Sequence, residues 1–234
     1  MRHEDAAAVR AMKLFRGVRD DSFTELIAAG FLQRFPPGVA LIHENEPADF
    51  LHVVVEGLVE MYAASAGRET TIDLVRPVGV FILAAVLNDQ VYLQSARTLE
   101  KAQILMIPAA KVRSTMTSDP AFMQAVVIEL ARDYRRSVKD LKNQKLRTAA
   151  ERLANWILRC EAEQGGRGRF EITYEKRVLA SRLGMTPENL SRAFATLRAH
   201  GVAVRGSLVE LTQPRSLVQF ANPDPLIDDP ELQT

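Results

Sequence analysis

The sequence predicts an α+β chain with a β-rich N-terminal domain, a long central helix and a C-terminal helix-turn-helix. Short apolar runs separated by turn residues fill residues 31–107. An apolar repeat of alternating four and three residues runs from Met123 to Leu141, and two short helical stretches flank Gly184. We therefore expect three segments, at residues 1–118, 119–146 and 147–234.

The first segment begins with helical sequence over residues 6–30 and then changes to short strands. Apolar, β-branched stretches end at Pro, Gly, Asn or Asp, which is typical of a jelly roll or barrel. The expected strands are Phe31–Phe35, Ala40–His43, Phe50–Glu56, Leu58–Ala63, Thr70–Val75, Leu93–Thr98 and Ala102–Ile107.

The second segment is predicted to be one long helix. Asp119 serves as its N-cap, and Pro120 occupies the first helical position. Its apolar residues follow the repeat of a coiled-coil seam. The seam residues are Met123, Val127, Leu130, Tyr134, Ser137 and Leu141. We expect this seam to join two copies in a parallel homodimer; the alternative is packing of the helix on its own domain.

The third segment opens with an amphipathic helix over Glu151–Ala162, which ends at a glycine-rich stretch. The elements expected after it are strand Phe170–Thr173, helix Tyr174–Leu183, helix Pro187–His200, and strands Ala203–Arg205 and Leu208–Leu211. The tail after Gln213 is rich in Pro and Asp, so we expect it to bury little.

The two helices around Gly184 have the signals of a helix-turn-helix. Glycine can end a helix at positive φ, and Thr186 with Pro187 can begin the next. A carboxylate can accept from cytosine, and a guanidinium can donate two bonds to guanine. We expect double-stranded DNA to be contacted by Thr186, Glu188, Asn189, Ser191 and Arg192, with Arg205 near a phosphate. The alternative is a surface ion pair between Glu188 and Arg192.

Charge is distributed unevenly along the chain, although the net charge is only +1. Residues 1–118 carry a net charge of −2, residues 119–146 +2, residues 147–215 +5 and residues 216–234 −4. A basic segment in the C-terminal third is compatible with nucleic-acid contact there.

Several classes of protein are excluded by composition. There is no apolar run of about 18 residues, so we expect no membrane partner. The charged N-terminus resembles no signal peptide, and we expect a cytoplasmic protein. Cys160 is the only cysteine, which excludes an intrachain disulfide and argues against a cysteine-ligated iron–sulfur cluster. We find no catalytic motif and expect no enzyme.

Residues 178–211 resemble the C-terminal helix-turn-helix of the CRP/FNR transcription-regulator family. Glu188-Asn189-Leu190-Ser191-Arg192 is similar to the E-x-x-S-R motif of its FNR-like branch. Residues 35–38, 44–48 and 53–59 are similar to the family's β-roll. The resemblance covers nearly the whole chain. It implies a cyclic-nucleotide-binding-like β-roll as sensor, a winged helix-turn-helix, a palindrome of TTGA-(T/C) half-sites and RNA polymerase as a partner.

The resemblance also locates an effector pocket. Relatives that bind cyclic AMP carry F-[IV]-G-E-L followed by R-[ST]-A, whose carboxylate and guanidinium bind ribose and phosphate. The corresponding positions here are Leu83, Ala84, Gln94 and Ser95. Without the Glu and the Arg we expect no cyclic-AMP binding. Arg97, at an odd offset from Gln94, should point to the opposite face of its strand.

Three kinds of control remain open: haem sensing a gas, an apolar small molecule, or abundance alone. Haem needs an axial ligand, and the candidates are His3, His43, His52 and Met61. The alternative function is a regulatory subunit that acts on a protein partner and not on DNA.

Overall fold

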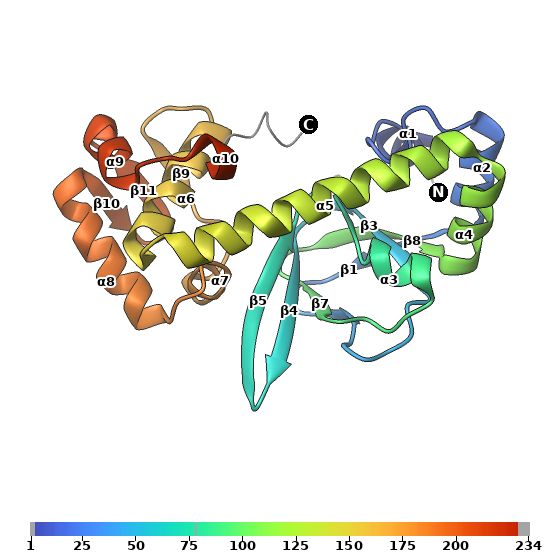
Figure 1. Ribbon diagram of the computed structural model, residues 1–234, viewed down its shortest axis with the longest axis horizontal. Helices are drawn as coiled ribbons and strands as arrows, with labels where there is room; N and C mark the ends of the chain where they lie inside the picture. The colour runs from blue at the N-terminus through green and yellow to red at the C-terminus, as the bar shows by residue number, and fades with distance from the viewer. Residues whose placement is uncertain (1–2, 78, 229–234) are drawn as a thin grey trace. The chain divides into compact units, whose positions relative to one another are not determined.

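The computed structural model describes residues 3–77 and 79–228. The chain forms two compact units, residues 1–131 and 132–234. Helix α5 (Pro120–Leu146) begins in the first unit and ends in the second, and Figure 1 draws it without a break. The predicted α+β class is confirmed.

The N-terminal unit is a β-roll of two four-stranded antiparallel sheets, with strand orders β1-β8-β3-β6 and β2-β7-β4-β5. Consecutive residues of β3 and β4 are buried, and Val53, Val59 and Met61 are part of the core of the β-roll. The strands are β1 (Phe31–Phe35), β2 (Ala40–Ile42), β3 (Phe50–Glu56), β4 (Val59–Ser65), β5 (Arg68–Val75), β6 (Gly79–Phe81), β7 (Ser95–Thr98) and β8 (Ala102–Pro108). All seven predicted strands are present, within two residues at each end.

The helices of this unit are α1 (His3–Arg10), α2 (Asp20–Ala29), α3 (Leu83–Asn88), α4 (Ala109–Ser118) and the first part of α5. The sequence did not predict α3, α4 or the three-residue strand β6. Helix α3 follows Ile82, whose φ of 69° is in the left-handed region, where a β-branched residue is disfavoured. No local pattern signals such a start, because the surrounding structure must hold Ile82 there.

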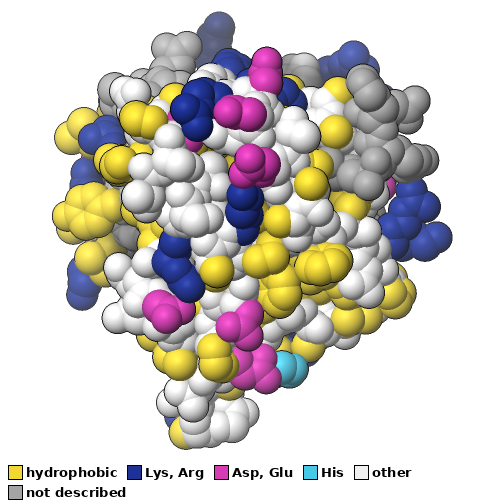
Figure 2. Space-filling view, turned by 90° about the vertical axis from the view of Figure 1, so that its right-hand side faces the viewer, with side chains coloured by type: hydrophobic (Ala, Val, Ile, Leu, Met, Phe, Trp, Pro, Cys, Tyr) yellow, Lys and Arg dark blue, Asp and Glu magenta, His cyan; other side chains and the backbone are white. Residues whose placement is uncertain are grey.

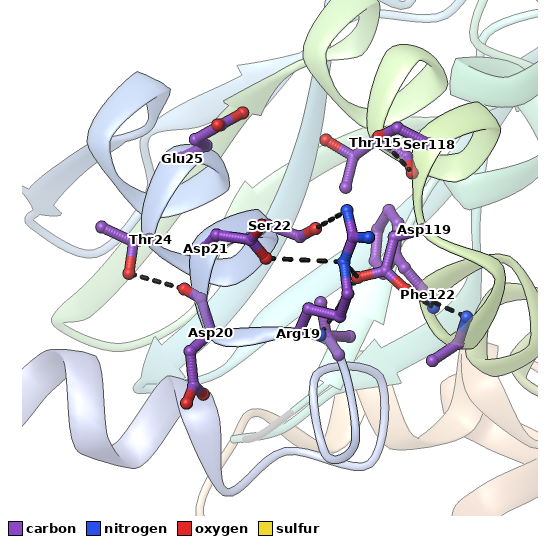
Figure 3. A network of polar contacts seen from close by, with 12 residues as sticks. Arg19, Asp20, Asp21, Ser22, Thr24, Glu25, Thr115, Ser118, Asp119 and Phe122 are labelled. Atoms are coloured by element: carbon purple, nitrogen blue, oxygen red, sulfur yellow. Dashed lines mark hydrogen bonds and ion pairs between the residues drawn. The ribbon is translucent and has the colours of Figure 1, made fainter.

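Asp119 fixes the beginning of α5, as the sequence predicted, and also ties this helix to α2. One carboxylate oxygen, Oδ1, accepts the backbone N–H groups of Ala121 and Phe122 at 3.0 and 3.3 Å. The other, Oδ2, accepts the N–H of Arg19 at 3.0 Å (Figure 3). Burial alone would raise the pKa of Asp119, but hydrogen bonds from Arg19, Ser22 and the helix outweigh it and lower the pKa.

The C-terminal unit has a second core, built around α6 and the helix-turn-helix; Leu153, Leu179 and Leu197 are fully buried in it. A capping box between Thr148 and Glu151 starts α6. The elements are α6 (Ala149–Glu163), β9 (Arg169–Glu171), α7 (Lys176–Arg182), α8 (Pro187–Leu197), η1 (Arg198–His200), β10 (Val202–Arg205), β11 (Leu208–Leu211), α9 (Pro214–Ala221) and α10 (Pro225–Asp228). The sheet order is β10-β11-β9.

The expectation that the tail after Gln213 buries little is wrong. Residues 214–221 form α9, in which Leu217 and Ala221 are buried. The Asn155 side chain donates from Nδ2 to the carbonyl oxygen of Ala221 at 2.7 Å, which ties the end of α9 to α6. Four of the eight residues of α9 are apolar, but so short a helix is not stable by itself, and packing on α6 decides the structure here.

Charged side chains are mixed on the face shown in Figure 2, where acidic and basic residues are interspersed with hydrophobic ones. No helix within residues 3–77 and 79–228 is long and apolar enough to cross a bilayer.

Candidate nucleic-acid interface

The turn between α7 and α8 is a Schellman motif around Gly184, whose φ is +64°. The N–H of Gly184 donates to the carbonyl of Ser181 at 2.9 Å, and that of Met185 donates to the carbonyl of Ala180 at 3.0 Å. A Cβ at position 184 would lie 2.3 Å from Oε1 of Gln144. Glycine is therefore favoured here by the positive φ, and a larger residue would also require the Gln144 side chain of α5 to move.

Helix α8 begins as the sequence predicted. The Thr186 hydroxyl accepts the N–H of Asn189 at 3.3 Å, and Pro187 occupies the first turn. The pKa of Glu188 is lowered, first by a hydrogen bond from the Thr186 side chain and also by the nearby charge of Arg192. At neutral pH residue 188 is therefore a carboxylate that can only accept hydrogen bonds.

The two faces of α8 differ as predicted. Leu190, Ala193 and Leu197 are buried, and Phe194 is half-buried beneath the Lys176 ammonium, 5.9 Å from its ring centroid. The residues expected to read or grip DNA are all exposed: Thr186, Glu188, Asn189, Ser191, Arg192 and, on the β10–β11 wing, Arg205. The Ser191 hydroxyl donates to the carbonyl of Pro187 at 3.1 Å. This surface thus offers acceptors and donors beside one another on a single helical face.

Two features of this interface were not predicted. Lys176 and Arg177 are exposed at the start of α7, where the basic pair after Glu175 is the only sequence signal. Arg152 of α6 lies beneath the turn, and its guanidinium donates to the carbonyls of Leu183 and Arg147 at 2.8 and 2.7 Å. The partners of Arg152 depend on tertiary structure, so no spacing in the sequence reveals them.

Helix α5 exposes an apolar face. Met123, Val127, Tyr134 and Leu141 of the predicted seam are exposed, and Tyr134 is 72% accessible. Leu130 instead packs partly against the core of the β-roll. Ile128 and Val138 are also exposed, although the seam did not include them.

The four predicted effector positions differ in burial and in secondary structure. Leu83 is buried and Ala84 exposed, both on α3, while Gln94 is half-buried in the loop before β7. The hydroxyl of Ser95, on β7, accepts the N–H of Glu44 at 2.9 Å. The strand begins at Ser95, two residues after its predicted start.

Arg97 is held by carboxylates on the same sheet. Its guanidinium donates to Glu60 at 2.7 Å and to Glu69 at 3.0 Å, and lies 4.2 Å from the ring centroid of Tyr62. Burial alone would lower the pKa of Arg97, but the hydrogen bonds that it donates to Glu60 and Glu69 outweigh burial and raise the pKa. Arg97 therefore cannot replace the missing phosphate-binding arginine, and these residues do not fit a cyclic nucleotide.

The candidate haem ligands differ in exposure. His43 is exposed, whereas His52 and Met61 are buried in the β-roll, and the side chain of His3 lies outside the described residues. The His52 ring stacks on Phe81 at 5.1 Å between centroids. Burial lowers the pKa of His52 to about 4, so the imidazole is neutral at physiological pH.

A β-roll, a long helix with an exposed apolar face and a winged helix-turn-helix together are the architecture of a DNA-binding regulator. Residues 32–119 match the family described as cyclic nucleotide-binding domain, and residues 151–220 match the Crp-like helix-turn-helix domain. The chain belongs to the CRP/FNR family of transcription regulators.

Individual proteins resemble this chain over most of its length. The CRP-like cAMP-activated global transcriptional regulator of Mycobacterium tuberculosis is 23% identical over 214 residues, which cover 89% of this chain and 96% of that protein. A Silicibacter pomeroyi regulatory protein, whose name proposes cAMP binding, matches with 27% identity and a TM-score of 0.62 over 94% of this chain and 100% of its own. FixK2 from Bradyrhizobium japonicum matches with a TM-score of 0.71 and 20% sequence identity, and the match covers 81% of this chain and 96% of FixK2.

Proposed function

We propose that two copies of this chain bind a palindromic duplex with half-sites resembling TTGA followed by T or C. The observation that carries this proposal is the exposed face of α8, where Glu188, Ser191 and Arg192 lie beside one another with hydrogen-bonding groups directed to solvent. A helix of this kind fits a major groove, and its N-terminal residues reach base edges. Exposed Lys176 and Arg177 at the start of α7 suit phosphates beside the groove.

Dimerisation is supported by α5. Large apolar side chains are exposed along one face of this helix, and a monomer would leave Tyr134 and Leu141 in water. A parallel pair of α5 helices would bury them and would place two reading helices about one duplex turn apart.

The signal that controls the regulator is proposed to be other than a cyclic nucleotide. The Mycobacterium relative is named as cAMP-activated, but here Ala84 and Gln94 stand at the motif positions and Arg97 is held by Glu60 and Glu69. Haem, an apolar effector and control by abundance remain the three candidates. An absorbance spectrum and an intact mass of the purified protein would separate haem and a retained ligand from the third.

DNA reading is tested by band shift on a TTGA-type palindrome and on a scrambled duplex of equal length. Arg192→Ala should cost about 1–3 kcal/mol on the palindrome and much less on the scrambled duplex. Arg159→Ala, which removes an exposed arginine of α6, is the matched control for lost charge. Equal loss with both duplexes would mean that Arg192 contacts only phosphate.

The dimer is tested by light scattering. Leu141→Glu places a charge in the proposed seam and should shift the protein to a monomer. Gln124→Glu adds the same charge about 100° away on the helix and should leave the mass unchanged. A monomeric wild-type protein at micromolar concentration would contradict the dimer.

A further inference from the structure

A cavity of about 270 Å³ lies in the C-terminal unit, between the last turns of α5, helix α6 and the segment that leads into α10. Its apolar lining consists of Trp156, Leu158, Ala162, Leu183, Pro223 and Ile227. Asn143 of α5 also lines the cavity and is two residues from Leu141, about 200° around the helix. Asn143 therefore lies on a different side of α5 from the seam residue Leu141.

Four basic residues line this cavity, Lys139, Arg147, Arg152 and Arg159, and of the three arginines Arg147 and Arg152 are the mostly buried ones. Arg152 is 9% exposed, and the acceptors of its guanidinium within residues 3–77 and 79–228 are backbone carbonyls of residues 144, 147, 183 and 184. Carbonyls satisfy the N–H groups but do not neutralise the cation, and burial lowers the pKa of Arg152. A buried cation without a carboxylate partner favours an anion nearby.

The second arginine, Arg147, already binds a carboxylate from the same chain. Its side chain is 7% exposed, and both terminal nitrogens donate to the two oxygens of Asp228 on α10. This two-pronged geometry is what a guanidinium offers to any carboxylate. Asp228 is 27% exposed, so its side chain can be displaced without breaking a core.

The other carboxylates that line the cavity have arginine partners of their own. Asp140 accepts from Arg182 of α7 at 3.0 Å, and Glu163 lies 4.0 Å from Arg159. They therefore do not neutralise Arg147 or Arg152. With Asp228 displaced, the lining next to the apolar surface would be cationic and open to an anion.

We propose that this cavity binds a small molecule with an apolar, preferably aromatic, body and one carboxylate. The apolar body lies against Trp156 and Ile227, and the carboxylate replaces that of Asp228 on Arg147. Asp228 thus acts as an internal competitor, and binding releases α10 from the junction between α5 and α6.

Trp156 is the only tryptophan of the chain and lines the cavity, so its fluorescence reports occupancy directly. The full-length protein would be titrated with 4-phenylbutyrate and with its neutral analogue 4-phenylbutanamide. We expect a saturable change in emission with the acid and binding at least about tenfold weaker with the amide, because the amide cannot form the charged pair. Equal affinity for the two compounds would overturn the proposal.

Variants of the ion pair give opposite expected results. Asp228→Asn removes the competitor and should tighten binding of the acid by about three- to tenfold, whereas Arg147→Gln should abolish it. Glu163→Gln, which removes another lining carboxylate, should change affinity less than about twofold. If Arg147→Gln fails to fold, the titration of Asp228→Asn still tests whether Asp228 competes with the ligand carboxylate. Unchanged or weaker binding by Asp228→Asn, or no saturable response from either protein, would refute the site.

Discussion

An aspartate holds each end of α5, but one aspartate is fully buried and the other is partly exposed to solvent. At the start, Asp119 is fully buried and accepts backbone N–H groups of Arg19, Ala121 and Phe122. Just beyond the end, Arg147 is held by the partly exposed side chain of Asp228. A buried carboxylate bonded to backbone cannot exchange partners with solvent, whereas a side-chain ion pair near the surface can.

This difference suggests a division of roles along one helix. The first turn of α5 is fastened to α2 as part of the β-roll, so its position there is set when the unit folds. The junction after Leu146 depends on a contact that a competing anion or a change in salt can remove. Adjustment of the junction is therefore expected at the C-terminal end of the helix and not at the start.

The largest expected effect is the loss of Asp119. Asp119→Ala should lower the free energy of unfolding of the N-terminal unit by about 2–3 kcal/mol, because buried N–H groups lose a charged acceptor. The measurement is urea unfolding of the full chain, followed by circular dichroism. Asp20→Ala, at a side chain that is 97% exposed, is the control and should cost less than about 0.5 kcal/mol. Equal costs would remove the contrast between the two ends.

The pH dependence of the free energy of unfolding should also show the contribution of Asp119. Because folding lowers the pKa of Asp119 below its ordinary value of 3.8, its stabilisation is complete above that pH and is lost as pH falls through the lower folded value. The stability difference between wild type and Asp119→Asn should therefore be constant near neutral pH and shrink in acid below about pH 4. A difference that grows on acidification would mean that the pKa is raised.

The smallest loss of stability among these predictions is expected at the C-terminal end of α5. Asp228→Asn should destabilise the C-terminal unit by about 1 kcal/mol, since the pair is partly exposed and Arg147 keeps Asn143 as an acceptor. This cost should fall as salt is raised, whereas that of Asp119→Ala should not. Fluorescence-detected unfolding in low and high salt measures it. A salt-independent loss of several kcal/mol would make the junction as permanent as the start of the helix.

The helix-turn-helix could be predicted because its signals are local. Gly184 marks the end of α7, Thr186 and Pro187 mark the start of α8, and the positions of the polar residues follow from helical periodicity. The partners of Arg152 and Arg147 could not be predicted, since each joins residues that only tertiary structure brings together. Helix α9 also depends on tertiary structure, because its eight residues are too few to form a stable helix without packing against α6.

The effector region was harder to predict for a different reason. The positions Leu83, Ala84, Gln94 and Ser95 correspond to a family motif whose charged residues this chain lacks. The left-handed Ile82 before α3 and the late start of β7 at Ser95 are backbone features that residue types do not encode.

The Arg152 side chain connects the end of α5 to the end of α7. Its guanidinium holds the carbonyl that follows α5 and the carbonyls at the end of α7 simultaneously, at 2.7 and 2.8 Å for Arg147 and Leu183. Arg152 therefore links the residue that follows α5 to the C-terminal end of α7. We expect a displacement of the end of α5 to be transmitted through Arg152 to the turn that precedes the reading helix α8.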